Sequence, residues 1–253
     1  MSIKLFDKDN HLNIAFTDLV NDQASVQSNQ FLIANNGQAA LIDPGGELTY
    51  SGLFMEMNKH VNSKELEYVL ASHQDPDIVA SINRWMNGTD CKLVCPEIWE
   101  RFIPHFSRAG KMQDRIISIP DRGMDIPLGR TVIKAIPAHF LHSEGNFQFY
   151  DPISKVLFSG DMGANLTHDN LDMPFKSFDE AIPSMKGFHQ RYMNSNTVCR
   201  YWANMVRSLD VQWMVPQHGR SFKGPKMVNA FLDWIEALPC GVDLMSQNDY
   251  RVC

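Results

Sequence analysis

The residues with the clearest chemical potential in this chain lie in the run 72–77, Ser-His-Gln-Asp-Pro-Asp. His73, Asp75 and Asp77 occupy alternate positions just after the apolar segment 68–71. Side chains at alternate positions can share a direction at a strand end or in the loop beyond it. Two carboxylates and an imidazole held together favour a metal ion, which offsets their negative charge. The alternative is a solvated turn in which the aspartates cap the following helix.

Four further candidates lie at the edges of expected strands. His139 and His142 lie in a polar loop between two strands, Asp161 follows an apolar run that ends in a glycine, and His218 directly precedes a glycine. Small residues in such loops allow a ligand to approach closely. This repeated placement favours one shared site over several unrelated surface residues.

Most of the other histidines and the cysteines need no chemical role. Histidines with polar or mixed neighbours are interpreted as surface or structural residues: His11, His60, His105, His168 and His189. The five cysteines are an odd, scattered set that does not resemble a disulfide framework. Cys91 and Cys95 have a spacing that fits no common zinc ribbon, so we interpret them as buried structural thiols.

Composition and charge set broad limits on function. The chain has 253 residues and a formal net charge of −6, which argues against a nucleic-acid backbone or an anionic membrane as the main partner. The N-terminus lacks the apolar region of a signal peptide, and no apolar run approaches membrane-spanning length. We therefore expect one cytoplasmic domain covering residues 1–253.

Strands and helices are expected in alternation. The pattern predicts strands at 31–33 and 39–42 around an Asn-Asn-Gly turn, and further strands at 68–72, 92–94, 115–119, 131–136, 146–150, 155–158 and 213–215. It predicts helices at 48–61, 77–86, 97–108 and 192–208, and another that begins at 225. Residues 163–185 have no clean period and are interpreted as a long surface excursion. This order indicates an α/β (α+β) protein with two packed sheets and helices outside.

Five segments, taken in order, resemble the metallo-β-lactamase superfamily. They are 41–45 (Leu-Ile-Asp-Pro-Gly), 73–77 (His-Gln-Asp-Pro-Asp), 142–145 (His-Ser-Glu-Gly), 158–161 (Phe-Ser-Gly-Asp) and 216–219 (Pro-Gln-His-Gly). The resemblance extends over most of the chain. It implies an αββα sandwich with a two-metal site at one edge of the sheets.

The resemblance also implies two sets of metal ligands that share one aspartate. The first set is His73, Asp75, His142 and the bridging Asp161. The second set is Asp77, Asp161 and His218. Three aspartates facing two divalent ions leave about one positive charge, which a bridging hydroxide would cancel.

Two positions separate the branches of this superfamily. The hydrolytic branch has His-x-His-x-Asp-His in the first motif and usually holds zinc, whereas this chain has Asp75 and Ile78 at two of those histidine positions. The pattern is closer to flavodiiron proteins and to the stand-alone oxygen-binding di-iron proteins. An added carboxylate favours iron or manganese over zinc. Without an imidazole at 78, the second metal would have three protein ligands and room for an exogenous molecule.

The resemblance therefore implies a di-iron protein that binds, senses or reduces dioxygen or a related small oxidant. We expect no flavin domain in this chain, so reduction would require an external electron-donor protein, and the related di-iron proteins suggest a homodimer. Weaker expectations concern Asp43, which could orient a ligand histidine or hold a loop amide, and His139, which could be a hydrogen-bond partner near the site. Tyr192 could place an aromatic ring near the metals or could simply pack its helix. The alternative is a zinc or manganese hydrolase of a thioester, lactone or phosphodiester.

Overall fold

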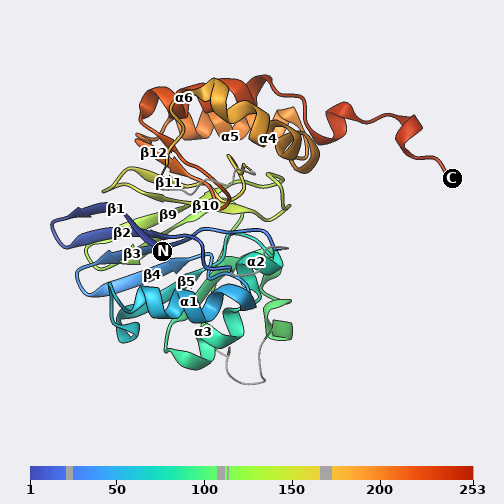
Figure 1. Ribbon diagram of the computed structural model, residues 1–253. Coiled ribbons are helices and arrows are strands. Elements are labelled where there is room, and N and C mark those ends of the chain that lie inside the picture. Colours follow the sequence, from blue (N-terminus) through green and yellow to red (C-terminus); the bar gives the residue numbers. More distant parts are fainter. Residues whose placement is uncertain (21–24, 107–111, 113, 166–172, 253) are drawn as a thin grey trace.

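Two sheets lie face to face between two layers of helices in the computed structural model of this chain (Figure 1). The structure describes residues 1–20, 25–106, 112, 114–165 and 173–252. The helices of the first half of the chain cover one outer face, and those of the last third cover the other. This αββα arrangement confirms the predicted fold class.

The first sheet has the strand order β1-β2-β3-β4-β5-β6-β7. Its strands are Ser2–Lys8, His11–Phe16, Gln30–Asn35, Gln38–Ile42, Leu66–Leu70, Lys92–Pro96 and Ile116–Ile119. Strands β1 to β4 are antiparallel neighbours, whereas β4 to β7 run parallel. The carboxyl ends of β4 and β5 therefore meet at one edge of the sandwich.

The second sheet has the order β13-β12-β11-β10-β9-β8. From β8 to β13 its strands are Met124–Leu128, Thr131–Pro137, Phe147–Asp151, Val156–Phe158, Trp213–Val215 and Phe222–Lys223. Strands β11 and β12 are the parallel pair. Their carboxyl ends also lie together, which brings the segments after residues 158 and 215 side by side.

Six α-helices form the outer layers of the part of the chain that the structure describes. Beneath the first sheet lie α1 (Glu47–Met57), α2 (Pro76–Val79) and α3 (Ile82–Gly88). Above the second sheet lie α4 (Phe178–Tyr192), α5 (Asn196–Arg207) and α6 (Pro225–Ala237). Each layer encloses an apolar cluster against its sheet.

A third apolar cluster fills the space between the two sheets. Within it the rings of Phe31, on β3, and Phe158, on β11, lie with their centroids 5.0 Å apart. Both side chains are about 1 % exposed, so their burial contributes roughly 2 kcal/mol or more each. The contact sets the separation of the two sheets close to the edge where the polar loops meet.

Several predicted elements were wrong in extent. The helix predicted at 97–108 is instead two short 3-10 segments, Glu97–Trp99 and Ile103–Phe106, because Pro104 has no N–H to continue a helix. The helix predicted at 77–86 is divided into α2 and α3 at Ser81, whose hydroxyl donates to the carbonyls of Pro44 and Gly45.

The predicted excursion at 163–185 was also partly wrong. Helix α4 begins inside it at Phe178 and continues through Pro183 to Tyr192, while 166–172 lie outside the described residues. The next helix therefore begins at Asn196, four residues later than its predicted start. Strands β1, β2 and β8 had no predicted counterpart. Among the described residues, no helix is long and apolar enough to cross a bilayer.

Candidate metal centre

His73 is positioned by a contact between two parallel strands. The carboxylate of Asp43, just after β4, accepts a hydrogen bond of 2.9 Å from the backbone N–H of Ser72, just after β5. The Ser72 hydroxyl in turn lies 2.9 Å from Nδ1 of His73. All three residues are buried. The imidazole is thereby held with Nε2 toward the edge of the sandwich, and Asp43 contacts the loop amide just before it.

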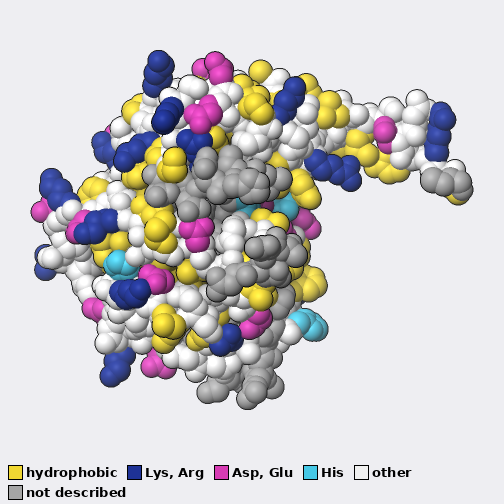
Figure 2. Space-filling model, viewed as in Figure 1, with side chains coloured by type: hydrophobic (Ala, Val, Ile, Leu, Met, Phe, Trp, Pro, Cys, Tyr) yellow, Lys and Arg dark blue, Asp and Glu magenta, His cyan; other side chains and the backbone are white. Residues whose placement is uncertain are grey.

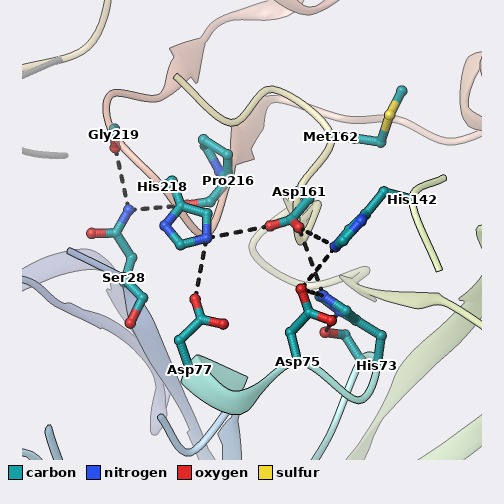
Figure 3. A network of polar contacts seen from close by, with 12 residues as sticks. Ser28, His73, Asp75, Asp77, His142, Asp161, Met162, Pro216, His218 and Gly219 are labelled. Carbon is teal, nitrogen blue, oxygen red and sulfur yellow. Dashed lines mark hydrogen bonds and ion pairs between the residues drawn. The ribbon is translucent and has the colours of Figure 1, made fainter. Parts of the chain in front are cut away.

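Four of the predicted ligands converge at this edge (Figure 3). One possible ligand atom from each of His73, Asp75, His142 and Asp161 lies within 4.8 Å of the other three. Nε2 of His142 lies 2.9 Å from Oδ2 of Asp161 and 3.1 Å from Oδ2 of Asp75. Nε2 of His73 lies 3.6 Å from the same oxygen of Asp161. This group has the size and donor types of a metal site.

Asp77 and His218 form a second group on the other side of Asp161. Nε2 of His218 lies 3.4 Å from Oδ2 of Asp77 and 3.5 Å from Oδ1 of Asp161. The two oxygens of Asp161 thus face different groups: Oδ2 faces the first group, and Oδ1 faces His218. Figure 3 shows this carboxylate between the imidazoles of His142 and His218.

The loop after β12 fixes the direction of His218. Its Nδ1–H donates a hydrogen bond of 2.7 Å to the backbone carbonyl of Gln27, because a carbonyl can only accept. Nε2 is therefore the unprotonated nitrogen of the neutral ring, and it faces Asp77 and Asp161. The following Gly219 has a φ of +78°, and a Cβ there would come within 2.2 Å of the Asn165 carbonyl. Only glycine fits that approach.

The cluster has a strong preference for positive charge. Burial raises the pKa of the Asp161 carboxyl, but His142, His73 and His218 outweigh it and lower that pKa to about 2. Burial lowers the pKa of His142, but its hydrogen bonds to Asp161 and Asp75 raise it to about 10. Hydrogen bonding to His142 holds the pKa of Asp75 far below its ordinary range. The carboxylates therefore attract either protons on the imidazoles or metal cations.

A cavity of about 660 Å³ opens over both groups. The side chains of Asp75 and Asp77 are about one third exposed in it. Its apolar walls include Phe188 and Tyr192, and the Tyr192 ring lies edge-on to His142 with the centroids 5.5 Å apart. The expected placement of Tyr192 near the cluster is therefore seen. The cavity therefore has charged side chains at its base and apolar side chains around its opening.

Similar proteins identify the family of this chain. Residues 26–219 match the family described as ODP family beta lactamase. The chain belongs to this ODP family. The predicted resemblance to the metallo-β-lactamase superfamily is therefore confirmed.

Solved structures agree with the family assignment. The peroxy diiron species of the chemotaxis sensor ODP is 34 % identical to this chain, with a TM-score of 0.87, and the match covers 98 % of this chain and 99 % of that one. The apo state of the chemotaxis sensor ODP from T. denticola is 33 % identical, with a TM-score of 0.86 and 99 % of both chains covered.

More distant matches are a solved structure of the same fold and a curated sequence. A mutant flavo di-iron protein from Thermotoga maritima is 18 % identical, with a TM-score of 0.73, and the match covers 93 % of this chain and 61 % of that chain. An uncharacterized protein of Methanocaldococcus jannaschii is 23 % identical over 202 residues, 77 % of this chain. The chain spans about half the length of that curated relative, since 49 % of it is covered.

In this ODP-family chain, two residues singled out from the sequence, His139 and Ile78, lie outside the cluster. Nε2 of His139 lies 2.7 Å from the backbone carbonyl of Asp121, and its ring packs edge-on against Phe147. His139 therefore links the loop that carries His142 to the backbone at Asp121. Ile78 is about 1 % exposed and packs in the apolar cluster beneath the first sheet. It is absent from the described lining of the large cavity, so it acts as a core residue of α2.

One residue that supports the site was assigned only a general surface or structural role from the sequence. His189, on α4, is fully buried; its Nδ1–H donates to the Met185 carbonyl, and its Nε2 accepts the N–H of Gly163, two residues after Asp161. Burial lowers the pKa of His189 to about 4, so the ring is neutral at physiological pH. The spacing Ser177-x-x-Glu180, typical of a helix start, could have indicated α4 and hence a structural histidine on it.

Proposed function

We propose that this protein binds and senses dioxygen, or a related peroxide-type oxidant, at a di-iron centre held by six residues. The proposed ligands are His73, Asp75, Asp77, His142, Asp161 and His218. The observation that carries the proposal is the placement of Asp161, whose two oxygens face two separate groups of imidazole and carboxylate side chains. A carboxylate in this position suits a bridge between two metal ions. The family match and the di-iron chemotaxis sensors support it.

The side chains present fit a bound metal. Two buried atoms in the cluster, Nε2 of His73 and Oδ1 of Asp161, have no hydrogen-bond partner among the described residues. A buried polar atom left unpaired costs free energy, on the order of 1–3 kcal/mol. Coordination to a cation would satisfy both atoms at once.

The donor set supports iron over zinc. Three imidazole nitrogens and three carboxylates supply no thiolate, and Asp75 stands where the hydrolytic branch has a histidine. Extra anionic oxygen donors favour iron or manganese and help to stabilise a ferric state. Two ferrous ions, when bound, supply the electrons with which dioxygen is captured. The alternative hydrolase function has no observation of its own in its favour.

The residues of this chain would act by positioning and shielding. The Ser72 hydroxyl, in contact with Nδ1 of His73, and the Gln27 carbonyl, in contact with Nδ1 of His218, fix the two rings with Nε2 toward the cluster. Phe188 and Tyr192 cover the His142 side with apolar surface and so limit solvent access. An external electron-donor protein would dock at the mouth of the large cavity, where Val26 and Leu48 are exposed.

We also propose that the protein forms a homodimer. After Cys240 the chain leaves the upper helical layer as an arm, residues 241–252, that projects from the body (Figures 1 and 2). The arm exposes apolar side chains, namely Val242, Leu244, Met245, Tyr250 and Val252. Its first 3-10 turn is hydrogen-bonded to the body through Val242 and Asp243, whereas the second has only capping hydrogen bonds within the arm, which are too weak to order so short a segment alone. A second copy of this chain would supply the missing surface.

We propose the cytoplasm as the site of action. Cys91, Cys95, Cys199 and Cys240 are buried free thiols, which suits a compartment that keeps thiols reduced.

Metal analysis of protein expressed in iron-supplemented medium tests the function. Two irons per chain, together with an absorption change when the reduced protein meets dioxygen, would support the proposal. Two tightly held zinc ions with esterase or phosphodiesterase turnover would refute it. Light scattering of wild-type protein and of the double variant Leu244→Ser/Tyr250→Ser tests the dimer: a wild-type monomer, or a variant dimer of unchanged affinity, would contradict the role of the arm.

A further inference from the structure

A small second cavity is lined in part by the imidazole of His73. Its volume is about 210 Å³, and it is enclosed between the loop after β5 and the two 3-10 segments that follow β6. Its walls include Ala71, Val79, Cys95 and Ile103, and His73 closes its inner end. Among the described residues, it has no lining residue in common with the 660 Å³ cavity. His73 lines the small cavity, and its Nε2 faces Asp75 and Asp161, which line the large one.

The walls of the small cavity offer little to a water molecule. A buried water needs two to four polar partners. Burial raises the pKa of the Cys95 thiol to about 12, so that wall is uncharged. The oxygen of Gln74 already accepts the Ser143 hydroxyl at 2.6 Å. Trp99 contributes one buried N–H that has no partner among the described residues. These groups leave the cavity predominantly apolar.

The small cavity also extends toward the surface. At its outer end lies Phe102, which is 54 % exposed, whereas Ile103 and Ala71 farther in are 3 % and 1 % exposed. An apolar molecule that entered beside Phe102 would pass mainly apolar side chains and an uncharged thiol before it met the His73 ring. The large cavity, in contrast, is floored by the carboxylates of Asp75 and Asp77.

We propose that this cavity binds dioxygen and delivers it to the cluster past His73. Delivery to the cluster rests on the proposed function. The affinity of the cavity for an apolar gas, in contrast, is a property of the cavity alone. Dioxygen is small and apolar, so it partitions from water into dry apolar space. An apolar cavity of about 150 Å³ is enough to bind xenon or benzene in a protein interior, and this one is larger.

Gas binding can be measured on the metal-free protein, without any activity. Methyl groups of Ala71, Val79 and Ile103 should show saturable shifts under xenon pressure by NMR, and enhanced relaxation under dissolved dioxygen. The methyls of Val228, in the upper core, serve as the internal control and should not respond. The variant Ile103→Phe should abolish the xenon response. Cavity methyls that respond no more than Val228 would overturn the proposal.

Delivery can be measured by stopped flow on ferrous protein of known iron content. Ile103→Phe and Cys95→Leu both narrow the small cavity, so each should lower the second-order rate constant for dioxygen by about three- to tenfold, with two irons retained. Ile235→Phe is the same change in the upper core and should leave the rate constant unaltered. Leu48→Trp narrows the large opening. A decrease with Leu48→Trp but not with the cavity variants would overturn delivery by this route.

The two proposals can fail separately. If wild-type protein holds no iron or ignores dioxygen while xenon still binds beside Ile103, the proposed function fails and the gas site stands. If iron-loaded protein reacts with dioxygen but the cavity methyls do not respond to either gas, the gas site fails and the proposed function stands.

Discussion

The carboxylate of Asp43 accepts the backbone N–H of Ser72 at 2.9 Å and so connects the carboxyl ends of two neighbouring parallel strands. Burial raises the pKa of Asp43 to about 6. Because the contact lies one residue before His73, the position of that imidazole depends on an acceptor at residue 43.

Removal of that acceptor should weaken metal binding. Asp43→Ala leaves the buried N–H of Ser72 unpaired, and we expect a 10- to 100-fold loss of metal affinity at the site. Asp43→Asn retains an acceptor oxygen and should restore most of the affinity. Competition with a chelator of known affinity measures both variants. Equal losses in Asn and Ala variants would indicate that charge, and not orientation, is what residue 43 supplies.

The role of Asp161 as a bridge can be separated from that of an ordinary ligand by metal stoichiometry. Asp161→Ala should lose both irons, since each group would lose one of its donors. Asp77→Ala removes a donor from the second group alone, and we expect about one iron per chain. Elemental analysis of the folded variants, with circular dichroism to verify folding, decides the matter. Two irons retained in Asp161→Ala would refute the bridging assignment.

Metal binding should release protons and weaken as the pH falls. Hydrogen bonds to the two aspartates raise the pKa of His142 to about 10, so metal must displace a proton there at neutral pH. The apparent dissociation constant should rise about tenfold per pH unit lost for each proton released. Calorimetry in two buffers of different ionisation enthalpy counts the protons. His142→Ala should release fewer; an unchanged count would assign the protons elsewhere.

His189 should make stability depend on pH in a predictable direction. Its folded pKa is lowered to about 4, so between that value and about 6.5 the unfolded chain binds more protons at this position. Its contribution to the free energy of unfolding is complete above pH 6.5 and decreases toward pH 4, by up to about 3 kcal/mol. Urea unfolding of wild type and His189→Gln across this range isolates the effect. Parallel pH profiles of the two proteins would contradict it.

A buried histidine–aspartate pair away from the cluster should contribute to the stability of the fold but not to iron binding. Nε2 of His11 lies 2.6 Å from the Asp151 carboxylate, which also accepts the side-chain amide of Asn13 at 2.8 Å. Asp151→Ala would leave these groups unpaired, and we expect a loss of about 3–5 kcal/mol in the free energy of unfolding. Iron content per folded chain should not change. A loss of iron in folded protein would show that the pair and the cluster are coupled.

The sequence indicated which polar side chains lie together better than it indicated the elements around them. His73, Asp75, His142 and Asp161 follow short apolar runs or glycines at strand ends, and such local signals persist whatever the exact strand boundaries are. In contrast, α4 was missed because Pro183 interrupts its helical pattern, and strand β8 because Pro127 lies within it. Tertiary packing overrides the local preferences of these residues.

The contacts that orient the ligands could not be predicted in detail. The carbonyl of Gln27 and the ring of His218 are 191 positions apart, and the contact depends on how two sheets meet. Likewise, the ring of His189 supports Gly163 only because α4 packs over the second sheet. One sequence without its relatives has no signal for such pairs.

The tilted rings of Phe31 and Phe158 lie between the sheet that carries His73, Asp75 and Asp77 and the sheet that carries Asp161 and His218. The distance between the two halves of the cluster is thus set by apolar packing between the sheets, not by the polar groups themselves. Selection could therefore retune the redox behaviour of the centre through apolar substitutions at the rings, without exchanging a single ligand. A search for natural variation in oxygen affinity among related chains should begin in this interior.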